Sequence, residues 1–285
     1  MNIILSRKGF DSSYGGYPSL VMPNGQMISL PIPNDEDDKK YSEISSGYRD
    51  MSLYDIMTQL KNWIQLGNTK HAITKKTRCH LDPDLRAKAY VRKNNWKGCF
   101  GQIGAASQVL INNDIGKDDL FLFFGWFQQC KETDGKLSLV KEESFHALAG
   151  YLQVEDILHT QQLERKSIPA WLQDHPHIRS DRYRNKLNTI YIARDHVSWN
   201  SRIQGYGTFS YTPKLKLTKE GLSRSKWNLP DIFRGKEITY HSESSWKPEG
   251  YFQSTARGQE FVVKESEDIA QWAQKIVNEH VNYGG

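Results

Sequence analysis

The run of residues 117–127, KDDLFLFFGWF, is the feature that most limits how this chain can fold. It follows the turn residues of 112–116, and a second apolar run, 146–154, comes after the turn residues of 133–135. Apolar, aromatic-rich runs bounded by turn residues are typical of strands that are buried in a sheet. Two such strands separated by a charged hairpin predict a β-rich core.

Shorter segments predict the elements around that core. Residues 2–5 and 189–193 are apolar runs that suit buried strands. Residues 267–281 carry apolar side chains at helical spacing and predict a closing helix, and residues 155–163 predict the start of a short one. We therefore expect a single α+β domain over residues 1–285, with a β-rich mixed sheet or partial barrel as its core, flanking helices and irregular polar loops.

A further helix is predicted from its start and stop signals. Ser52 is followed three residues later by Asp55, which approximates a capping box. An apolar stripe then runs from Leu53 to Ile64, and Gly67 lies where a C-terminal cap belongs. This pattern indicates a helix with a structural role.

Cysteine usage and hydropathy indicate the compartment. Cys79, Cys99 and Cys130 lack CxxC spacing, which predicts reduced thiols. Charged residues interrupt the apolar N-terminus too early for a signal peptide, and no apolar run approaches the roughly 18 residues of a membrane span. We therefore expect a cytoplasmic protein without a membrane partner.

The positive charge of the chain is concentrated in one region. The formal net charge is +5, but residues 161–236 hold 15 lysines and arginines against 6 aspartates and glutamates. Tryptophans and tyrosines are interleaved with these cations. Cations that meet phosphates and rings that stack on bases suit a nucleic-acid partner. The alternative is a solvated basic face above aromatic core residues, because charge bias is a weak indicator of function.

The first polar cluster follows the N-terminal apolar run. Arg7, Lys8, Asp11, Ser12 and Tyr14 lie in a loop that contains three glycines. A strand that ends in such a loop can hold reactive side chains on rigid scaffolding, and the glycines let another chain approach closely. The same pattern is compatible with a plain turn whose charges are solvated.

The second polar cluster is the segment CHLDPDL at 79–85. His80, Asp82 and Asp84 alternate, so in an extended segment their side chains would share one face. Two carboxylates and an imidazole on one face suit acid–base chemistry or metal binding. Pro83 offers a simpler interpretation, because an Asp-Pro pair commonly begins a turn.

Two further motifs leave their roles open. Small residues in FGQIGAASQVL, at 100–110, would let backbone amides face a phosphate, although close helix packing explains them equally well. Their glycine spacing fits neither a P-loop nor a dinucleotide-binding fingerprint. His175 and His177 flank a proline, but no partner cluster has the usual spacing of a metal site. The spacing therefore favours hydrogen bonding or phosphate contact by these histidines over metal binding.

The third polar cluster precedes the last predicted strand. Arg257, Gln259 and Glu260 lie in QSTARGQEFVV, at 253–263. Upstream, the segment SRSKW carries Arg224 and Lys226, whose side chains are donors suited to phosphate. A β-rich core would allow the three polar clusters to come together.

As a set, these motifs resemble one known family. SRKGFDSSYGG, PIP, HLDPDL, FGQIGAA, DLFLFFGWF, HPH, NTIYIA and RGQEFV resemble the bacterial and phage family called the nucleotide modification associated domain, third type. That family is linked to hypermodified DNA in conflicts between phages and bacteria. The chain also looks similar to antiphage DNA glycosylases, which excise bulky bases such as glucosylated hydroxymethylcytosine and leave abasic sites. The resemblance implies an antiviral enzyme that acts on double-stranded phage DNA with modified bases. It implies no cofactor, no metal and no obligate protein partner.

The resemblance also implies roles for the polar residues. A glycosylase must extract the base from the stack, stabilise an oxocarbenium-like sugar, and activate water or attack with an amine. Asp11 is the first candidate for the catalytic carboxylate and Asp82 the second, while Lys8 is either the amine or, as we prefer, a phosphate clamp. The residues expected to recognise the base or sugar are Ser12, Tyr14, His80, Gln102, Arg257, Gln259 and Glu260. Those expected to hold DNA phosphates are Arg7, Arg179, Arg182, Arg224 and Lys226.

Two other functions stay open at this point. The runs 118–124 and 148–154 vaguely resemble the barrel strands of PUA-like modules, in which a flipped base occupies an aromatic pocket without being altered. The chain would then be a reader of modified bases. An enzyme that installs or alters the modification would need a donor, and the sequence carries no nucleotide-sugar or methyl-donor signature.

Overall fold

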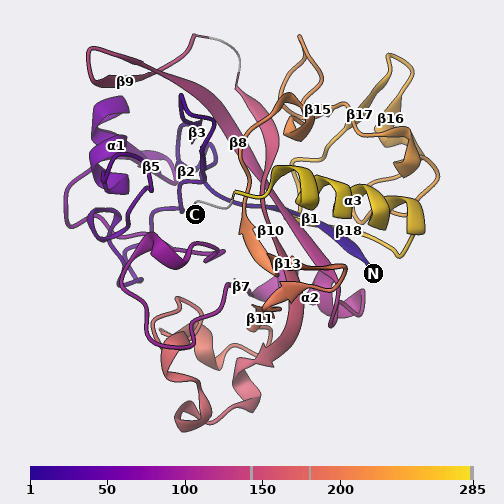
Figure 1. Ribbon diagram of the computed structural model, residues 1–285, viewed down its shortest axis with the longest axis horizontal. Helices are drawn as coiled ribbons and strands as arrows, with labels where there is room; N and C mark the ends of the chain where they lie inside the picture. The colour runs from indigo at the N-terminus through magenta and orange to yellow at the C-terminus, as the bar shows by residue number, and fades with distance from the viewer. Residues whose placement is uncertain (142–143, 180, 283–285) are drawn as a thin grey trace.

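The computed structural model describes residues 1–141, 144–179 and 181–282. Its centre is a ten-stranded sheet that curls into a half-barrel (Figure 1). The main path of this sheet is β18 (Glu260–Val263), β1 (Ile3–Arg7), β8 (Leu120–Thr133), β10 (Phe145–His159), β11 (Thr189–Ala193) and β7 (Cys99–Gln102). β1 and β8 are parallel, and the other neighbours on this path are antiparallel. The α+β class and the partial-barrel core are therefore confirmed.

The remaining strands extend this sheet or form small ones. β14 (Tyr206–Thr208) pairs with β10, β3 (Ser19–Val21) and β9 (Lys136–Leu139) pair with β8, and β4 (Met27–Ile28) pairs with β3. The small sheets are β2 (Tyr14–Gly15) with β5 (Trp63–Leu66) and β6 (Thr69–Ala72), β12 (His196–Val197) with β13 (Asn200–Gln204), and β15 (Lys226–Trp227) with β17 (Tyr251–Gln253) and β16 (Trp246–Lys247).

Three α-helices occur within the described ranges: α1 (Leu53–Leu60), α2 (Gly104–Asn112) and α3 (Glu267–His280). Short 3-10 helices occupy Tyr41–Glu43, Ala87–Ala89, Thr160–Gln162, Arg165–Ser167, Ala170–Leu172, Asp181–Arg184, Pro213–Leu215, Asp231–Phe233 and Glu243–Ser245. No helix in the part of the chain that the structure describes has the length and hydropathy needed to span a bilayer.

The first half of strand β8, residues 120–125, is buried on both of its faces. Leu122 and Phe124 belong to one core cluster, to which α3 contributes, whereas Phe121 and Phe123 belong to another, to which α2 contributes. In the second cluster the Phe100 ring lies 5.1 Å from the Phe121 ring, edge to face. A strand segment that is covered on both sides is apolar on both faces, which is why residues 120–125 have no polar alternation.

The sheet order brings three strand ends to one place. In the parallel pair, Arg7 at the end of β1 lies opposite Phe124 in the middle of β8. In the antiparallel pair, Glu260 at the start of β18 lies opposite Ser6 of β1. β7 ends at Gln102, whose side chain reaches Glu260. Segments that are far apart in the sequence therefore meet beside the end of β1.

Several predicted elements are confirmed. β1, β11 and α3 form where the apolar patterns predicted them. Ser52 caps α1 in a complete capping box, with the Asp55 amide donating to the Ser52 hydroxyl at 3.1 Å. The cysteines at 79, 99 and 130 are free and buried, and burial raises the pKa of each thiol.

Two predicted helical segments are wrong. α1 ends at Leu60, and Ile64 belongs to strand β5. Gly67 is in the turn between β5 and β6, where its φ of +59° suits glycine. Residues 155–159 continue β10 and pair with β11, so a 3-10 helix begins only at Thr160. In both places a partner strand supplies backbone hydrogen bonds that the local pattern does not reveal.

We expect Gly125→Ala to destabilise the fold by about 1–3 kcal/mol, because there is no room for a methyl group in β8 at this point. A Cβ on Gly125 would lie 2.6 Å from the carbonyl oxygen of Lys8, and that oxygen is backbone. Chemical denaturation measures the free energy of unfolding. Gly116→Ala is the matched control, since its nearest neighbour would be 3.7 Å away, and a change of less than about 0.5 kcal/mol is expected. Equal effects of the two substitutions would contradict the close approach of β8 to the opening loop.

Candidate functional site

A polar cleft of about 720 Å³ lies where the end of β1, the end of β7 and the start of β18 meet. The opening loop, the 79–85 segment and the loop before β18 all contribute to its lining. The sequence-predicted residues that line it are Arg7, Lys8, Asp11, Ser12, Tyr14, His80, Asp82, Gln102, Arg182, Arg224 and Gln259. The fold therefore brings parts of all three polar clusters together.

Three cations among the predicted DNA contacts lie outside this lining, and so does the buried Glu260. Arg179 forms an ion pair with Asp38. The Lys226 ammonium lies 5.0 Å from the centre of the Tyr251 ring, and Arg257 is exposed in the loop before β18. Contact of these three cations with DNA stays a prediction, and it would require the DNA to extend beyond the cleft.

The opening loop is a rigid turn at the mouth of the cleft. One carboxylate oxygen of Asp11 accepts hydrogen bonds from the amides of Ser13 and Tyr14, both at 2.7 Å. Gly15 has a φ of +94°, and a Cβ there would lie 2.0 Å from the buried Phe10 ring. Glycine is therefore required at this position. The Asp11 side chain is exposed and helps to close the turn.

Arg7 connects the opening strand to the loop before β18. Its guanidinium donates hydrogen bonds to the carbonyl oxygens of Thr255, at 2.5 Å, and Ala256, at 3.0 Å. It also lies 5.7 Å from the ring centre of Phe124 and 5.5 Å from that of Phe261. Burial lowers the pKa of Arg7 from its usual value near 12.5, but arginine side chains stay protonated in proteins at neutral pH. Arg7 thus stabilises one wall of the cleft and adds positive charge to it.

A tryptophan and a histidine form another part of the lining. Trp126 of β8 lies opposite His146 of β10, and the Arg224 guanidinium lies 4.1 Å from the centre of the Trp126 ring. The indole N–H of Trp227 donates to His146 Nδ1 at 3.1 Å, which assigns the imidazole proton to Nε2. Burial, followed by the nearby arginines, lowers the pKa of His146 to about 3, so this histidine is neutral at pH 7.

Lys8 and Glu260 form a buried ion pair at the floor. Lys8 Nζ lies 2.9 Å from Glu260 Oε1 and 4.2 Å from the centre of the Phe100 ring. The Lys8 side chain is 11% exposed and the Glu260 side chain 0%. Gln102 donates to the same carboxylate oxygen at 2.6 Å. Lys8 is therefore fixed by its contacts with Glu260 and Phe100, and it lines the floor of the cleft.

Asp82 is a buried carboxylate surrounded by three imidazoles, and its side chain is 4% exposed. Its Oδ1 accepts a hydrogen bond from the Gly101 amide at 2.8 Å and lies 3.3 Å from His175 Nε2. Its Oδ2 lies 3.9 Å from His177 Nε2 and 4.0 Å from His80 Nε2. Burial alone would raise the pKa of Asp82, but the histidines overcome it and lower the pKa to about 2. Asp82 is thus an anion at neutral pH.

Two of these imidazoles are held on their far sides. His80 Nδ1 lies 2.7 Å from a carboxylate oxygen of Asp37, which also pairs with Arg182 at 2.6 Å. His177 Nδ1 lies 2.5 Å from the side-chain oxygen of Asn188. Burial lowers the pKa of His177 to about 3, so its ring is neutral at pH 7.

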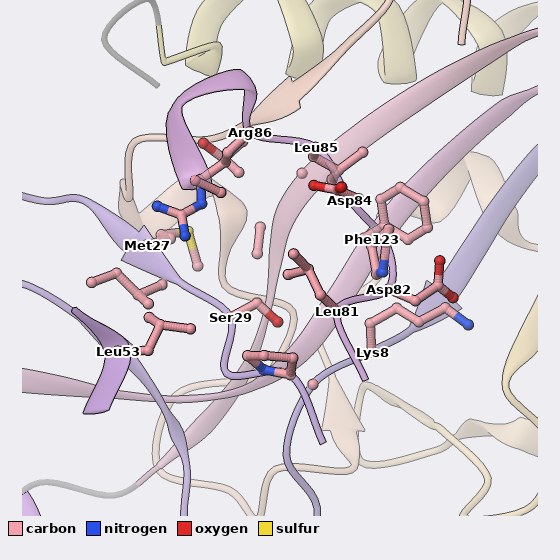
Figure 2. A pocket seen from close by; sticks show the side chains of 18 of the residues that line it. Lys8, Met27, Ser29, Leu53, Leu81, Asp82, Asp84, Leu85, Arg86 and Phe123 are labelled. Carbon is pink, nitrogen blue, oxygen red and sulfur yellow. The ribbon is translucent and has the colours of Figure 1, made fainter. Parts of the chain in front are cut away.

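Asp84 does not share this site, so the prediction that its side chain lies on one face with His80 and Asp82 is wrong. It makes a bidentate ion pair with Arg92, with separations of 2.5 and 2.6 Å. Asp84 instead lines a small cavity of about 60 Å³ that adjoins the cleft. Figure 2 shows Lys8 and Asp82 at one end of this cavity and Arg86 at the other.

Comparison with known families identifies the chain. The family described as nucleotide modification associated domain 3 matches residues 2–264. The chain belongs to this family. The match confirms the resemblance inferred from the motifs and associates the chain with nucleotide modification. Searches of curated proteins and of solved structures found no match.

Some residues around the cleft of this nucleotide modification associated domain 3 protein are absent from the sequence-predicted set. Trp126 and His146 belong to core strands. The one sequence signal that could have indicated them is His146 itself, a histidine in an apolar run. Asp37 lies in a charged loop with no motif around it, whereas Asn188 begins the NTIYIA segment just before β11, whose pattern predicts a strand and not part of a site. Their partners, His80 and His177, are 43 and 11 residues away in the chain.

We expect Lys8→Met to lower the free energy of unfolding by about 3–5 kcal/mol, because it leaves Glu260 as a buried charge without its counter-ion. Thermal and denaturant unfolding measure the loss. The double variant Lys8→Met/Glu260→Gln is the control, and it should recover much of the stability since no unpaired charge is left. A double variant as unstable as Lys8→Met alone would show that lost packing, and not the buried charge, causes the effect.

Proposed function

We propose that this chain is a DNA glycosylase that excises a bulky modified base, such as glucosylated hydroxymethylcytosine, from phage DNA in antiviral defence. The observation that carries the proposal is the buried Asp82 cluster in a polar cleft whose lining includes arginines and a tryptophan. The family link to nucleotide modification supports a nucleotide as the ligand. Hydrolysis of the bond between base and sugar is the reaction class that best uses these groups.

The cleft suits a nucleotide that has been rotated out of the duplex. Its volume of about 720 Å³ exceeds what an unmodified base needs and leaves room for an attached sugar. Enzymes that act on a base in duplex DNA extrude it, at a cost of a few kcal/mol. The Trp126 ring offers a surface on which a base can stack, and Arg224 beside it offers a cation to a phosphate.

Asp82 is our first candidate for the catalytic carboxylate, ahead of Asp11. Both line the cleft, but Asp82 is buried among imidazoles, whereas Asp11 is exposed and closes a turn. A charge in a site shielded from water acts more strongly on a reacting group than an exposed charge does. The order of preference taken from the sequence is therefore reversed.

The proposed reaction is hydrolysis of the bond between C1′ of the deoxyribose and the base nitrogen. The oxygen of a water molecule forms a bond to C1′, and the bond from C1′ to the base breaks. The electron pair of that bond leaves with the base, which also receives the proton that the water releases. The Asp82 cluster holds and activates this water. Lys8 and Gln102, which line the cleft and are both bonded to the buried Glu260 carboxylate, would contact the sugar hydroxyls or the polar edge of the base.

We expect the chain to release free base from DNA that contains glucosylated hydroxymethylcytosine and to leave unmodified DNA intact. Mass spectrometry of the released bases and alkaline cleavage of abasic sites measure the reaction. Asp82→Asn should slow release by roughly 10²–10⁴-fold, as expected for loss of an acid–base group, while DNA binding persists. Asp11→Asn is the matched control in the same cleft and should have a much smaller effect. Tight binding of modified DNA without base release would instead identify a reader of modified bases.

We expect Arg224→Ala to weaken DNA binding and to reduce the salt dependence of log K by about one unit, because one phosphate contact is lost. Fluorescence anisotropy at several salt concentrations measures both quantities. Arg257→Ala is the control, since Arg257 is an exposed arginine outside the cleft lining. A larger loss with Arg257→Ala would mean that DNA binds to the surface beside the cleft and not across its mouth.

A further inference from the structure

We propose that His80, Asp82 and His177 bind one divalent transition-metal ion in the cleft. The ligand atoms of these three residues lie within 4.8 Å of one another. His80 and Asp82 come from the 79–85 segment and His177 from the loop between β10 and β11, so the fold creates the set. Two imidazoles and one carboxylate form a ligand set that holds zinc or iron and leaves positions open for water or substrate. The inference concerns the same cleft as the proposed glycosylase activity and rests on it for the role of the ion.

The hydrogen bonds of both imidazoles direct a lone pair toward the proposed ion. His80 Nδ1 donates to the ionised Asp37 carboxylate, which can only accept. The Asn188 amide nitrogen donates to Thr160 and to the backbone carbonyl of His177, so its oxygen is left to accept from His177 Nδ1. In its neutral form, each histidine therefore carries its proton on Nδ1 and presents a lone pair on Nε2. Metal-binding histidines are commonly held by acceptors in this way.

The carboxylate is oriented in the same direction. The Gly101 amide donates to Asp82 Oδ1 at 2.8 Å. His175 Nδ1 accepts from the His177 amide at 3.2 Å, so a ring proton of His175 is on Nε2, which lies 3.3 Å from the same Oδ1. The Gly101 hydrogen bond and the His175 ring both lie at Oδ1, and Oδ2 is left facing the other two imidazoles. His175 is thus a positioning residue for Asp82 and not a ligand.

The two lone pairs and the carboxylate oxygen converge without hydrogen bonds between them. The separations of 3.9 and 4.0 Å from Asp82 Oδ2 to the Nε2 atoms are too long for hydrogen bonds. Bonds of about 2.1 Å to a tetrahedral ion place its ligand atoms about 3.4 Å apart. The three ligand atoms lie within 4.8 Å of one another, so each needs to move by about half an ångström. A cation at this point would satisfy three acceptors that otherwise face one another. Imidazole ligands favour zinc or iron over magnesium or calcium.

The close packing of the cluster also fits a built site. A Cβ on Gly101 would lie 2.4 Å from the ring of His177. Only glycine therefore allows this imidazole to approach Asp82 while the Gly101 amide donates to the Asp82 carboxylate.

The role of the ion follows from the proposed hydrolysis. A bound divalent ion lowers the pKa of its water toward about 7, and the hydroxide supplies the oxygen that bonds to C1′. The proton released from that water leaves with the base.

Metal binding can be measured on the full chain without DNA. After removal of metal with a chelator, the protein is titrated with Zn²⁺ by calorimetry and with Co²⁺ by visible absorption, which reports coordination directly. We expect one ion per chain, and at least a 100-fold loss of affinity in each of His80→Gln, Asp82→Asn and His177→Gln. Asp37→Asn should weaken binding by about 10–100-fold through His80. His71→Gln is the matched control, because His71 is an exposed histidine on β6.

The outcomes separate this inference from the proposed activity. Circular dichroism and thermal unfolding of each variant establish that a loss of binding is not a loss of fold. Absence of a saturable site in the unaltered chain, or affinity unchanged in folded His80→Gln and His177→Gln, would overturn the metal site. Base release by chelator-treated protein would leave the glycosylase proposal intact while removing the role of the ion. Metal binding without base release would leave the metal site intact and overturn the glycosylase proposal.

Discussion

The burial of the first half of β8 on both faces is the constraint on which the rest of this structure depends. A strand covered by apolar side chains on each side cannot carry charged groups in its middle, because an unpaired buried charge is costly. Polar groups therefore gather around it, where β1 and β18 end or begin and where loops cross. The parallel pairing of β1 with β8 and the antiparallel pairing with β18 bring Lys8 and Glu260 to the same place. The cleft forms at this boundary between core and solvent.

Buried charges in this cleft are matched to particular partners. Lys8 pairs with Glu260 and Gln102, and Asp82 is held by a backbone amide and a histidine. A buried pair often contributes little net stability, but loss of one member leaves the other unsatisfied. The geometry of these groups is therefore strongly fixed. Fixed polar groups in a site with little water are what catalysis and metal binding both require.

Much of the fold could be predicted from the sequence, but only part of the arrangement of the site could. Apolar runs predicted β1, β8, β10 and β11 because those strands are buried. The polar clusters were recognised, but their internal order was not. Asp84 alternates with Asp82 yet pairs with Arg92, since the chain turns between them. The preference for hydrogen bonding over metal at His177 rested on spacing, which cannot show that His80 and Asp82 lie beside it.

The sequence by itself determined that this chain forms a β-rich α+β fold, that three polar clusters interrupt it, and that it resembles the nucleotide modification associated domain 3 family. Those properties depend on local composition and on motifs. The tertiary structure alone decided which polar residues meet: that Asp37 holds His80, that Asn188 holds His177, and that Asp82 lies between the two imidazoles. The physical reason is that these contacts depend on strand pairing between segments far apart in the chain. The residues next to each side chain in the sequence therefore do not show which partner it will meet.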